Sequence, residues 1–363
     1  MPASASEHGA APGDASHANR FHQGPTLTDP RLRIVFVPHT DVNNAYVSRM
    51  QEILRGFGMV EQFMRPKQFL RELFGGRFRR YDATFFNWVE NDFLTRKTGE
   101  ISAKNIAKVV LKTLVARAMS RRLVFVRHNV YPHALRAGQE ERARKLIDWY
   151  ERLFDVVLSH SGAHLVRGQR YCPHPLYRTV AEEGIDIERL MPGLPDDYFV
   201  MFGRAAPYKR IVETARDFPA NRNLLIIGSV TDAAYGERIA AVRRPNIFYR
   251  PGYIDDALAQ YLIRRSKGIV LAHAGENTVV SGSFFYAMSM PVPVLAVETP
   301  FLQWVRPQVG EDLLVLAPDL AHLLRLASEF QPKASVAGMQ ALLQQSFGDH
   351  VIAEALKPVF QVH

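Results

Sequence analysis

Short apolar runs alternate with amphipathic stretches along this chain, and the alternation predicts strands that take turns with helices. In the first half, the apolar runs predict strands over residues 33–39, 81–88, 123–127, 156–160 and 171–175. The amphipathic stretches predict helices over residues 45–57, 102–122, 140–154 and 162–168. Strands that alternate with helices pair in parallel, and their helices cover both faces of the sheet.

The same pattern resumes after an acidic segment with Pro and Gly at residues 182–197, which we expect to be a linker. Beyond it, strands are predicted over residues 198–203, 223–228, 247–253, 268–273 and 291–296. Helices are predicted over residues 209–216, 255–266 and 281–290. The pattern therefore predicts an α/β protein with two parallel-sheet units.

A chain of 363 residues is long enough for two domains, each with its own core. We expect a disordered tail over residues 1–24, which are rich in Ala, Ser, Gly and His and have no apolar run typical of a signal peptide. The expected domains are residues 25–181 and 198–345, with a C-terminal helix at 346–363 that packs back on the first domain.

Charge is distributed unevenly along the chain. The net charge is +9, yet residues 31–178 hold 27 lysines and arginines against 13 aspartates and glutamates. A basic half beside an acidic half indicates a polyanionic partner for one half, either nucleic acid or the anionic face of a membrane. The single cysteine, Cys172, excludes an internal disulfide and a cysteine metal cluster.

The segment from Tyr198 to Phe218 predicts a buried strand, a short loop and a helix. Gly203 ends the strand, and Arg204 and Lys209 follow in the loop and at the helix start. Free backbone N–H groups and two cations at one point favour an anion, and a diphosphate has a suitable length. The alternative is an ordinary strand-to-helix turn with two solvated cations.

A second strand-to-helix junction offers similar chemistry. Ser281, Gly282 and Ser283 supply hydroxyls and unhindered backbone N–H groups at a helix start, and this predicts a second phosphate cradle. An ordinary helix N-cap explains the same residues.

Polar side chains also follow the strands of the first half, at the sheet edge where ligands bind in α/β proteins. They are Asp41, Asn43, Asn44, Glu90, His128, Asn129 and His133. Helix caps, turns and hydrogen-bonded packing residues are the alternative interpretation of each.

The helix predicted at 102–122 has a stripe of lysines, Lys104, Lys108 and Lys112, at helical spacing. The apolar side of this helix is formed by Ile106, Val109, Val110, Leu114 and Val115. The stripe is either a solvated surface or a face that lies on anionic lipid, helped by Arg117, Arg121 and Arg122.

Together, these motifs resemble a known family. The second half is similar to the donor-binding half of GT-B glycosyltransferases, which have two Rossmann-like domains facing each other across a cleft. The resemblance rests on F-G-R…Y-K-R (202–210), L-L-I-I-G (224–228), Y-R-P-G-Y (249–253), G-I-V-L-A (268–272) and S-G-S-F-F-Y-A-M-S-M-P-V-P-V-L-A (281–296). The first half resembles bacterial exopolysaccharide enzymes of the xanthan β-mannosyltransferase type, through Y-D-A-T-F-F-N-W-V-E-N (81–91) and V-F-V-R-H-N-V-Y-P-H (124–133).

The resemblance implies transfer of a hexose from a nucleotide diphosphate sugar to a polyprenyl-diphosphate-linked oligosaccharide. Mannose, donated by GDP-mannose, is one such hexose. It implies a cytoplasmic enzyme held peripherally on the anionic inner membrane, with no cofactor, no metal and no nucleic-acid partner. Carried over by residue, the donor is bound by Gly203, Arg204, Lys209, Gly252, Tyr253, Ser281, Gly282 and Ser283. The acceptor is expected at Asn43, Asn44, Asn129 and His133.

The chain departs from the retaining members of that family at two positions. Tyr286 and Thr278 stand where those families usually have glutamates, one of which grips the ribose. The departure favours inversion, which requires a general base for the acceptor hydroxyl. Glu90 is the first candidate for this base, with Asp41 and His128 as alternatives.

Two other functions remain open at this point. A nucleic-acid-binding protein would use the same basic half, although aromatic residues are not interleaved with the basic stripe. A Rossmann dehydrogenase or epimerase is disfavoured because no G-x-G-x-x-G follows the first strand.

Overall fold

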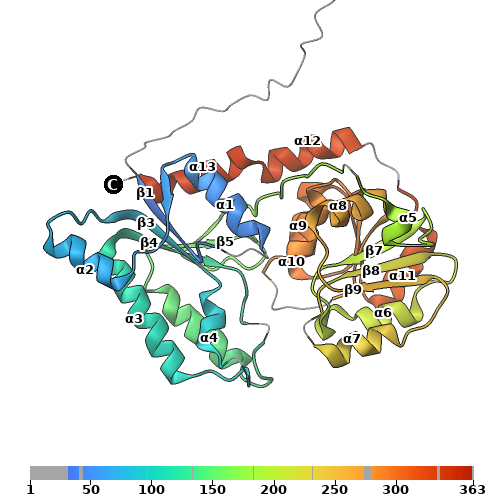
Figure 1. Ribbon diagram of the computed structural model, residues 1–363, viewed down its shortest axis with the longest axis horizontal. Coiled ribbons are helices and arrows are strands. Elements are labelled where there is room, and N and C mark those ends of the chain that lie inside the picture. The colour runs from blue at the N-terminus through green and yellow to red at the C-terminus, as the bar shows by residue number, and fades with distance from the viewer. Residues whose placement is uncertain are drawn as a thin grey trace, which may run out of the picture.

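The computed structural model describes residues 32–361, except for 41–43, 96, 133, 183, 231, 274–278 and 333–335. Two six-stranded parallel sheets lie side by side, and helices cover both faces of each (Figure 1). The α/β class and the two Rossmann-like halves predicted from the sequence are confirmed.

The N-terminal sheet has the strand order β2-β1-β3-β4-β5-β6. Its strands are β1 (Arg33–Val37), β2 (Met59–Glu61), β3 (Tyr81–Asn87), β4 (Ser120–Arg127), β5 (Val156–Ser159) and β6 (Gln169–Tyr171). Its helices are α1 (Ala45–Arg55), α2 (Pro66–Phe74), the 3₁₀ turn η1 (Val89–Phe93), α3 (Ala103–Met119) and α4 (Glu140–Glu151). Helix α1 covers one face, and α2, α3 and α4 cover the other.

The C-terminal sheet has the order β12-β11-β10-β7-β8-β9. Its strands are β7 (Tyr198–Phe202), β8 (Asn223–Gly228), β9 (Ile247–Pro251), β10 (Gly268–Leu271), β11 (Val294–Val297) and β12 (Leu314–Ala317). The remaining helices are α5 (Ile187–Leu190), η2 (Pro207–Lys209), α6 (Ile211–Asp217), α7 (Ala233–Ala240), α8 (Asp256–Arg265), α9 (Gly282–Met288), α10 (Pro300–Val309), α11 (Leu320–Glu329), α12 (Val336–Phe347) and α13 (Asp349–Phe360).

Helix α13 returns to the N-terminal sheet and lies beside α1 (Figure 1). Ile352, Leu356 and Val359 are buried in the same cluster as the strands β1, β3 and β4. Arg122 fixes the end of this helix by donating to the carbonyl oxygens of Pro358 and Val359, at 2.9 and 3.1 Å. The last helix of the described chain therefore packs on the N-terminal sheet, beside the first strand.

The long helix predicted at residues 102–122 is shorter than expected. It ends at Met119, because Ser120 already pairs with Tyr81 in the sheet. Arg121 and Arg122 therefore lie on a strand rather than on the helix. Two residues of the predicted apolar side, Leu114 and Val115, face solvent, with exposed fractions of 52% and 39%.

Other differences concern short elements. Residues 162–168 form turns instead of the predicted helix, and a further strand, β12, follows the last one predicted. The pattern also missed β2 and the helices α2, α7, α10, α11 and α12. Strand β2 has only three residues, and α2, although amphipathic, has only nine. Within the described residues, no helix combines the length and the apolar character needed to cross a bilayer.

Candidate functional site

A turn at the carboxyl end of β7 forms the centre of the C-terminal site. The strand is buried because its apolar residues lie between two helical layers, and Gly203 ends it with a φ of +99°. The 3₁₀ turn η2 comes next and contains Lys209, so α6 begins later than the sequence predicts. Arg210 links the two with a φ of +54°, a left-handed conformation that few side chains adopt.

Two glycines allow the strand ends to approach each other closely. A Cβ on Gly228, at the end of β8, would lie 2.1 Å from the carbonyl oxygen of Gly203. The φ of Gly228 is +139°, which also favours glycine. The absence of both side chains therefore keeps the loop after β7 tight against the sheet edge.

Lys209 folds back over this turn toward α9. Its Nζ donates to the carbonyl oxygen of Phe202 at 3.2 Å and lies 3.5 Å from the Oγ of Ser283. The same Oγ donates to the Phe202 carbonyl at 3.3 Å. A small hollow beside Lys209 is lined by the ends of β7 and β10, including Gly203 and His273. Lysine and serine thus share one backbone acceptor at the mouth of the sheet.

The positive charge at this mouth is not neutralised by the described residues. Neither Lys209 nor Arg204 forms an ion pair within the described part of the chain. Burial, helped by the nearby Arg204 guanidinium, lowers the pKa of Lys209 to about 8. Two cations that disfavour each other's charge create a local demand for an anion.

The second predicted cradle is divided between two roles. The Oγ of Ser281 accepts from the backbone N–H of Phe284 at 3.3 Å and the residue is buried, so Ser281 is the N-cap of α9. Gly282 is exposed, and Ser283 is half-buried beside Lys209. Both α9 and α6 are only seven residues long. The side-chain cations therefore supply more of the positive charge than the helix starts do.

One helical turn beyond Ser283, the ring of Tyr286 stacks on Phe202 with a centroid distance of 4.6 Å. Its hydroxyl donates to Oδ1 of Asp256, at the start of α8, at 2.9 Å. Asp256 is exposed and follows the loop in which Gly252 and Tyr253 stand. Tyr253 is 76% exposed. Nothing in the sequence pattern singles out Asp256, which lies twelve residues before β10, the strand that leads to α9.

Glu90 is in a different environment from the one the sequence suggested. It lies in η1 and has no exposed surface, so it does not line an open cleft. Oε1 accepts from Nδ2 of Asn129 at 3.1 Å, and Oε2 is buried with no hydrogen-bond partner among the described residues. Burial raises the pKa of this carboxyl group to about 7. A carboxylate with that pKa and one unoccupied oxygen can accept a proton near neutral pH.

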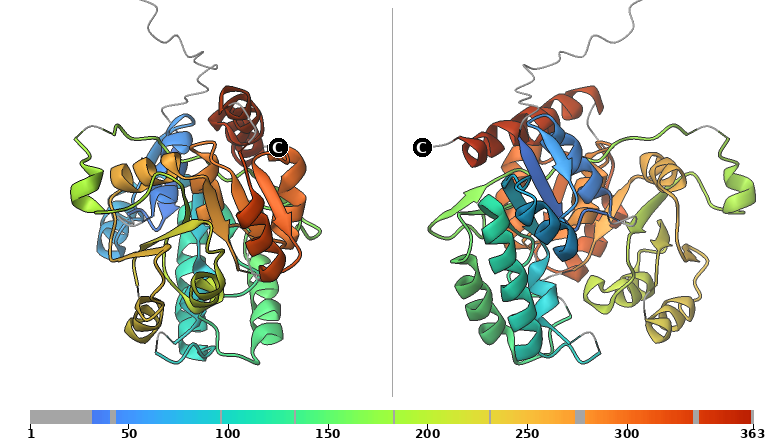
Figure 2. Two further views of the ribbon diagram at one scale, coloured as in Figure 1. Left: turned by 90° about the vertical axis from the view of Figure 1, so that its right-hand side faces the viewer. Right: turned by 60° about the vertical axis from the view of Figure 1, so that its left-hand side comes forward.

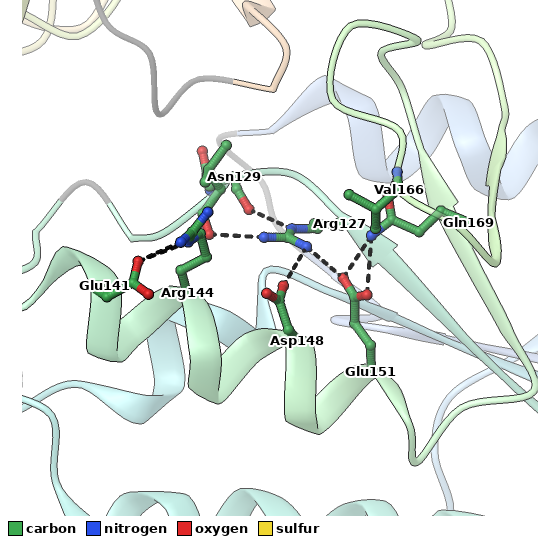
Figure 3. A network of polar contacts seen from close by, with 9 residues as sticks. Arg127, Asn129, Glu141, Arg144, Asp148, Glu151, Val166 and Gln169 are labelled. Carbon is green, nitrogen blue, oxygen red and sulfur yellow. Dashed lines mark hydrogen bonds and ion pairs between the residues drawn. The ribbon is translucent and has the colours of Figure 1, made fainter.

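The loop that carries Asn129 is fixed by Arg127 (Figure 3). The guanidinium of Arg127 donates to the carbonyl oxygens of Asn129 and Val130 at 3.2 and 3.1 Å. It also forms ion pairs with Asp148 and Glu151 of α4, at 3.0 and 2.9 Å. Arg127 therefore fixes the backbone of Asn129, while the side-chain amide of Asn129 donates to Glu90.

His128 belongs to a chain of buried rings that joins the two sheets. Trp88 stacks on His128 with a centroid distance of 4.3 Å. The ring of His160 lies 5.3 Å from that of His128, and the ring of His174 lies 5.2 Å from that of His160. His174 then stacks on Phe285 of α9 at 4.3 Å. Burial keeps the pKa of all three histidines below its usual value, so they are neutral at pH 7. The rings place α9 against the carboxyl edge of the N-terminal sheet.

Of the remaining residues predicted for catalysis or acceptor binding in the first half, the structure describes only Asn44. Asn44 is the N-cap of α1, where its Oδ1 accepts from the N–H of Tyr46 at 3.1 Å. Asp41, Asn43 and His133 lie outside the described residues. The structure adds a groove of about 410 Å³ between η1 and α3, which the sequence did not predict. It is lined by Asn91, Asp92, Leu94, Thr95, Asn105, Lys108, Val109 and Lys112.

In the described part of the chain, no group of three or more His, Cys, Asp or Glu side chains is placed to hold a metal ion. The two halves thus contribute a cationic mouth on one sheet and a buried carboxyl group on the other.

No protein-family model matches the chain, and no curated protein matches it by sequence. Solved structures do match. HepE of Anabaena, crystallised with UDP and glucose, has a TM-score of 0.61 at 14% identity, over 90% of this chain and 99% of HepE. Sucrose-phosphate synthase of Thermosynechococcus elongatus has a TM-score of 0.61 at 15% identity, over 91% of this chain and 98% of the synthase.

A third match is AviGT4, a glycosyltransferase of avilamycin A biosynthesis, with a TM-score of 0.52 at 14% identity, over 91% of this chain and 97% of AviGT4. These matches extend over both sheets and nearly the whole of each relative. The chain therefore has the GT-B fold, with two Rossmann-like halves.

Proposed function

We propose that this GT-B chain is a glycosyltransferase that takes a hexose from a nucleotide diphosphate sugar. The observation that carries the proposal is the cationic mouth formed by Lys209, Arg204 and Ser283, which has no carboxylate partner among the described residues. A diphosphate supplies the missing negative charge. The structures of HepE with UDP, glucose and UDP-glucose support this ligand class.

The donor would lie along α9. Its diphosphate would contact Lys209 and Ser283, and its ribose would extend one helical turn further, toward Tyr286 and Asp256. Because Asp256 is exposed and holds the Tyr286 hydroxyl through only one oxygen, its other oxygen can accept from a ribose hydroxyl. Tyr253 and Gly252 would border the base. Asp256 would thus take the ribose-binding role that the resemblance gives to one of the two glutamates missing at positions 278 and 286.

Transfer requires stabilisation of the leaving group and removal of a proton. As the acceptor hydroxyl attacks the anomeric carbon, the bond to the diphosphate breaks and negative charge grows on the departing nucleotide. Lys209 and Arg204 would stabilise that charge without reorganising. Glu90 would take the proton, which gives an inverting reaction that needs neither a metal nor a cofactor. Since Glu90 is buried, the acceptor must displace the residues that cover it.

The acceptor we propose is a polyprenyl-diphosphate-linked oligosaccharide of exopolysaccharide assembly, used by an enzyme that lies peripherally on the cytoplasmic face of the inner membrane. The groove with Lys108 and Lys112 offers two cations, with Asp92 as the one acid in its lining, and suits the acceptor diphosphate. The donor implied by the sequence resemblance is GDP-mannose, whereas UDP-glucose is the one seen with HepE.

A thermal-shift screen of GDP-mannose, UDP-glucose and ADP-glucose tests the proposal. A ligand that binds only the folded state raises the melting temperature by mass action, so the sugar nucleotide that responds identifies the donor class. We expect one of the first two to stabilise the protein. If no nucleotide sugar raises the melting temperature at millimolar concentration, the proposed function is wrong.

A further inference from the structure

Two neighbouring helices of the N-terminal half present apolar side chains to solvent. Thirteen large apolar side chains of the described residues are well exposed, and six of them lie on α2 and α3. They are Leu70, Leu73 and Phe74 on α2, and Leu111, Leu114 and Val115 on α3. Each set has the spacing i, i+3, i+4, so each forms a stripe along one helix face. We call these six residues the outer stripe.

Helix α2 lies next to the C-terminal end of α3. Phe69 on the inner face of α2 packs in the same cluster as Met119, the last residue of α3. Arg80, which follows α2, donates to the carbonyl oxygens of Arg117 and Ala118 at 3.1 and 3.2 Å. The right-hand view of Figure 2 shows α2 and α3 together on the half of the molecule that carries the N-terminal sheet. The two parts of the outer stripe therefore lie on neighbouring helices of the same half.

Cations surround the outer stripe with few acids. Residues 65–80 contain six lysines and arginines and one acid, Glu72. Helix α3 contains Lys104, Lys108, Lys112 and Arg117 and no acid. Lys67 and Arg71 flank the stripe on α2, and both are exposed. Exposed leucine and phenylalanine beside lysine and arginine are typical of helices that lie in the interface of an anionic bilayer.

We propose that the outer faces of α2 and α3 are a docking surface for an anionic lipid bilayer. The inference rests on the proposed function, because a lipid-linked acceptor is reached at the bilayer surface. Charge decides against a second copy of the chain as the occupant: a symmetric contact through this surface would place its cations opposite one another. Lipid headgroups supply the opposite charge, and acyl chains cover the leucines and Phe74.

The position of the groove fits this orientation. Lys108 and Lys112 line the groove, and Leu111 lies between them on α3. A phosphate-bearing headgroup bound in the groove would therefore have its lipid chain beside the outer stripe. Helix α3 would connect the bilayer to the carboxyl edge of the sheet, where Glu90 lies.

Vesicle co-sedimentation of the full chain tests the docking surface. We expect binding to vesicles that contain phosphatidylglycerol, and binding at least tenfold weaker to pure phosphatidylcholine or in 0.5 M salt. The double variant Leu73→Ser/Phe74→Ser and the variant Lys67→Glu/Arg71→Glu should each reduce binding at least tenfold. The control Leu165→Ser/Val166→Ser changes two exposed apolar residues elsewhere in the same half and should bind like the wild type.

The donor site gives an independent readout, since it lies on the other sheet. Each variant should keep the nucleotide-induced thermal shift, which shows that it is folded. Equal vesicle binding by the wild type and the Leu73/Phe74 variant would overturn the docking surface. So would a dimer in analytical ultracentrifugation that this variant dissociates, or an oligonucleotide that binds in place of the vesicles. Vesicle binding with no response to any nucleotide sugar would instead overturn the proposed function alone.

Discussion

The Nζ of Lys209 lies 3.5 Å from the Oγ of Ser283, and both donate to the carbonyl oxygen of Phe202. The two residues are 74 positions apart and come from the ends of different strand–helix units. Their shared acceptor positions an ammonium group and a hydroxyl at one point. An incoming phosphate oxygen can replace the Phe202 carbonyl as the acceptor of both.

The affinity for a nucleoside diphosphate should decrease as the pH rises through about 8. Burial and Arg204 place the pKa of Lys209 there in the free protein, so the ammonium form is lost above that pH. A bound diphosphate favours the charged form, and binding near pH 8 should therefore take up a proton. Calorimetric titrations in buffers of different ionisation enthalpy measure this uptake. A dissociation constant that stays flat from pH 7 to 9.5 would contradict the assignment.

Glu90→Gln should stabilise the fold at high pH and abolish transfer. The raised pKa of Glu90 means that the native state holds a proton between pH 4.5 and about 7 that the unfolded state loses. The folding free energy therefore becomes less favourable as the pH rises across this window, by about 3 kcal/mol in total. Removing the charge should recover much of this lost stability at pH 8 and little at pH 4.5.

Denaturant unfolding at both pH values measures the difference, with the exposed Glu237→Gln as the matched control. Glu90→Gln should keep the nucleotide-induced thermal shift, because the donor lies on the other sheet. Full transfer activity in this variant would exclude Glu90 as the base.

Asp256→Asn should weaken the binding of ribonucleotides more than the binding of their deoxyribose analogues. A hydrogen bond to a charged group contributes about 1.5–3 kcal/mol, so the loss should be roughly 10- to 100-fold for the ribonucleotide. Tyr286→Phe should have a smaller effect in the same direction, because it frees the carboxylate that the Tyr286 hydroxyl orients. Asp312→Asn, at an exposed position on the same domain, is the control. Equal losses for ribose and deoxyribose ligands would place the ribose elsewhere.

Gly228→Ala should destabilise the protein strongly. The new Cβ would lie 2.1 Å from the Gly203 carbonyl oxygen, at a φ that alanine disfavours, so the loop after β7 must move. We expect a loss of about 3 kcal/mol or more in the free energy of unfolding. In Gly338→Ala, by contrast, the new Cβ in α12 has no described atom within 4 Å. This substitution should stabilise the protein by up to about 1 kcal/mol. Similar unfolding curves for the two variants would contradict this account of the loop.

Hydrophobic periodicity was sufficient to predict the parallel α/β architecture, because buried strands such as β8 and β10 are nearly uniform apolar runs. Gly203 and Lys209 could be predicted for the same reason, since they directly follow such a run. The burial of Glu90 could not, because it depends on how η1 packs against α3 and α4. Asp256 was missed because its contact with Tyr286 spans 30 residues and two helices.

The exposed face of α3 shows a second limit. Periodicity identifies an apolar side, but it does not say which side faces the sheet when lysines and leucines alternate around the helix. Val109 and Ala116 are buried, while Leu114 and Val115 point outward. Only the packed structure separates the core residues from the outer stripe.

The central claim is that Lys209 receives the negative charge of a nucleoside diphosphate. Calorimetric titration of the responding nucleoside diphosphate into the wild type, Lys209→Ala and Lys267→Ala tests it most directly. Lys267 lies at the opposite edge of the same sheet, just before β10, and is the matched control. We predict a 10- to 100-fold loss of affinity in Lys209→Ala and wild-type affinity in Lys267→Ala. Unchanged binding in Lys209→Ala would contradict the donor site proposed for this protein.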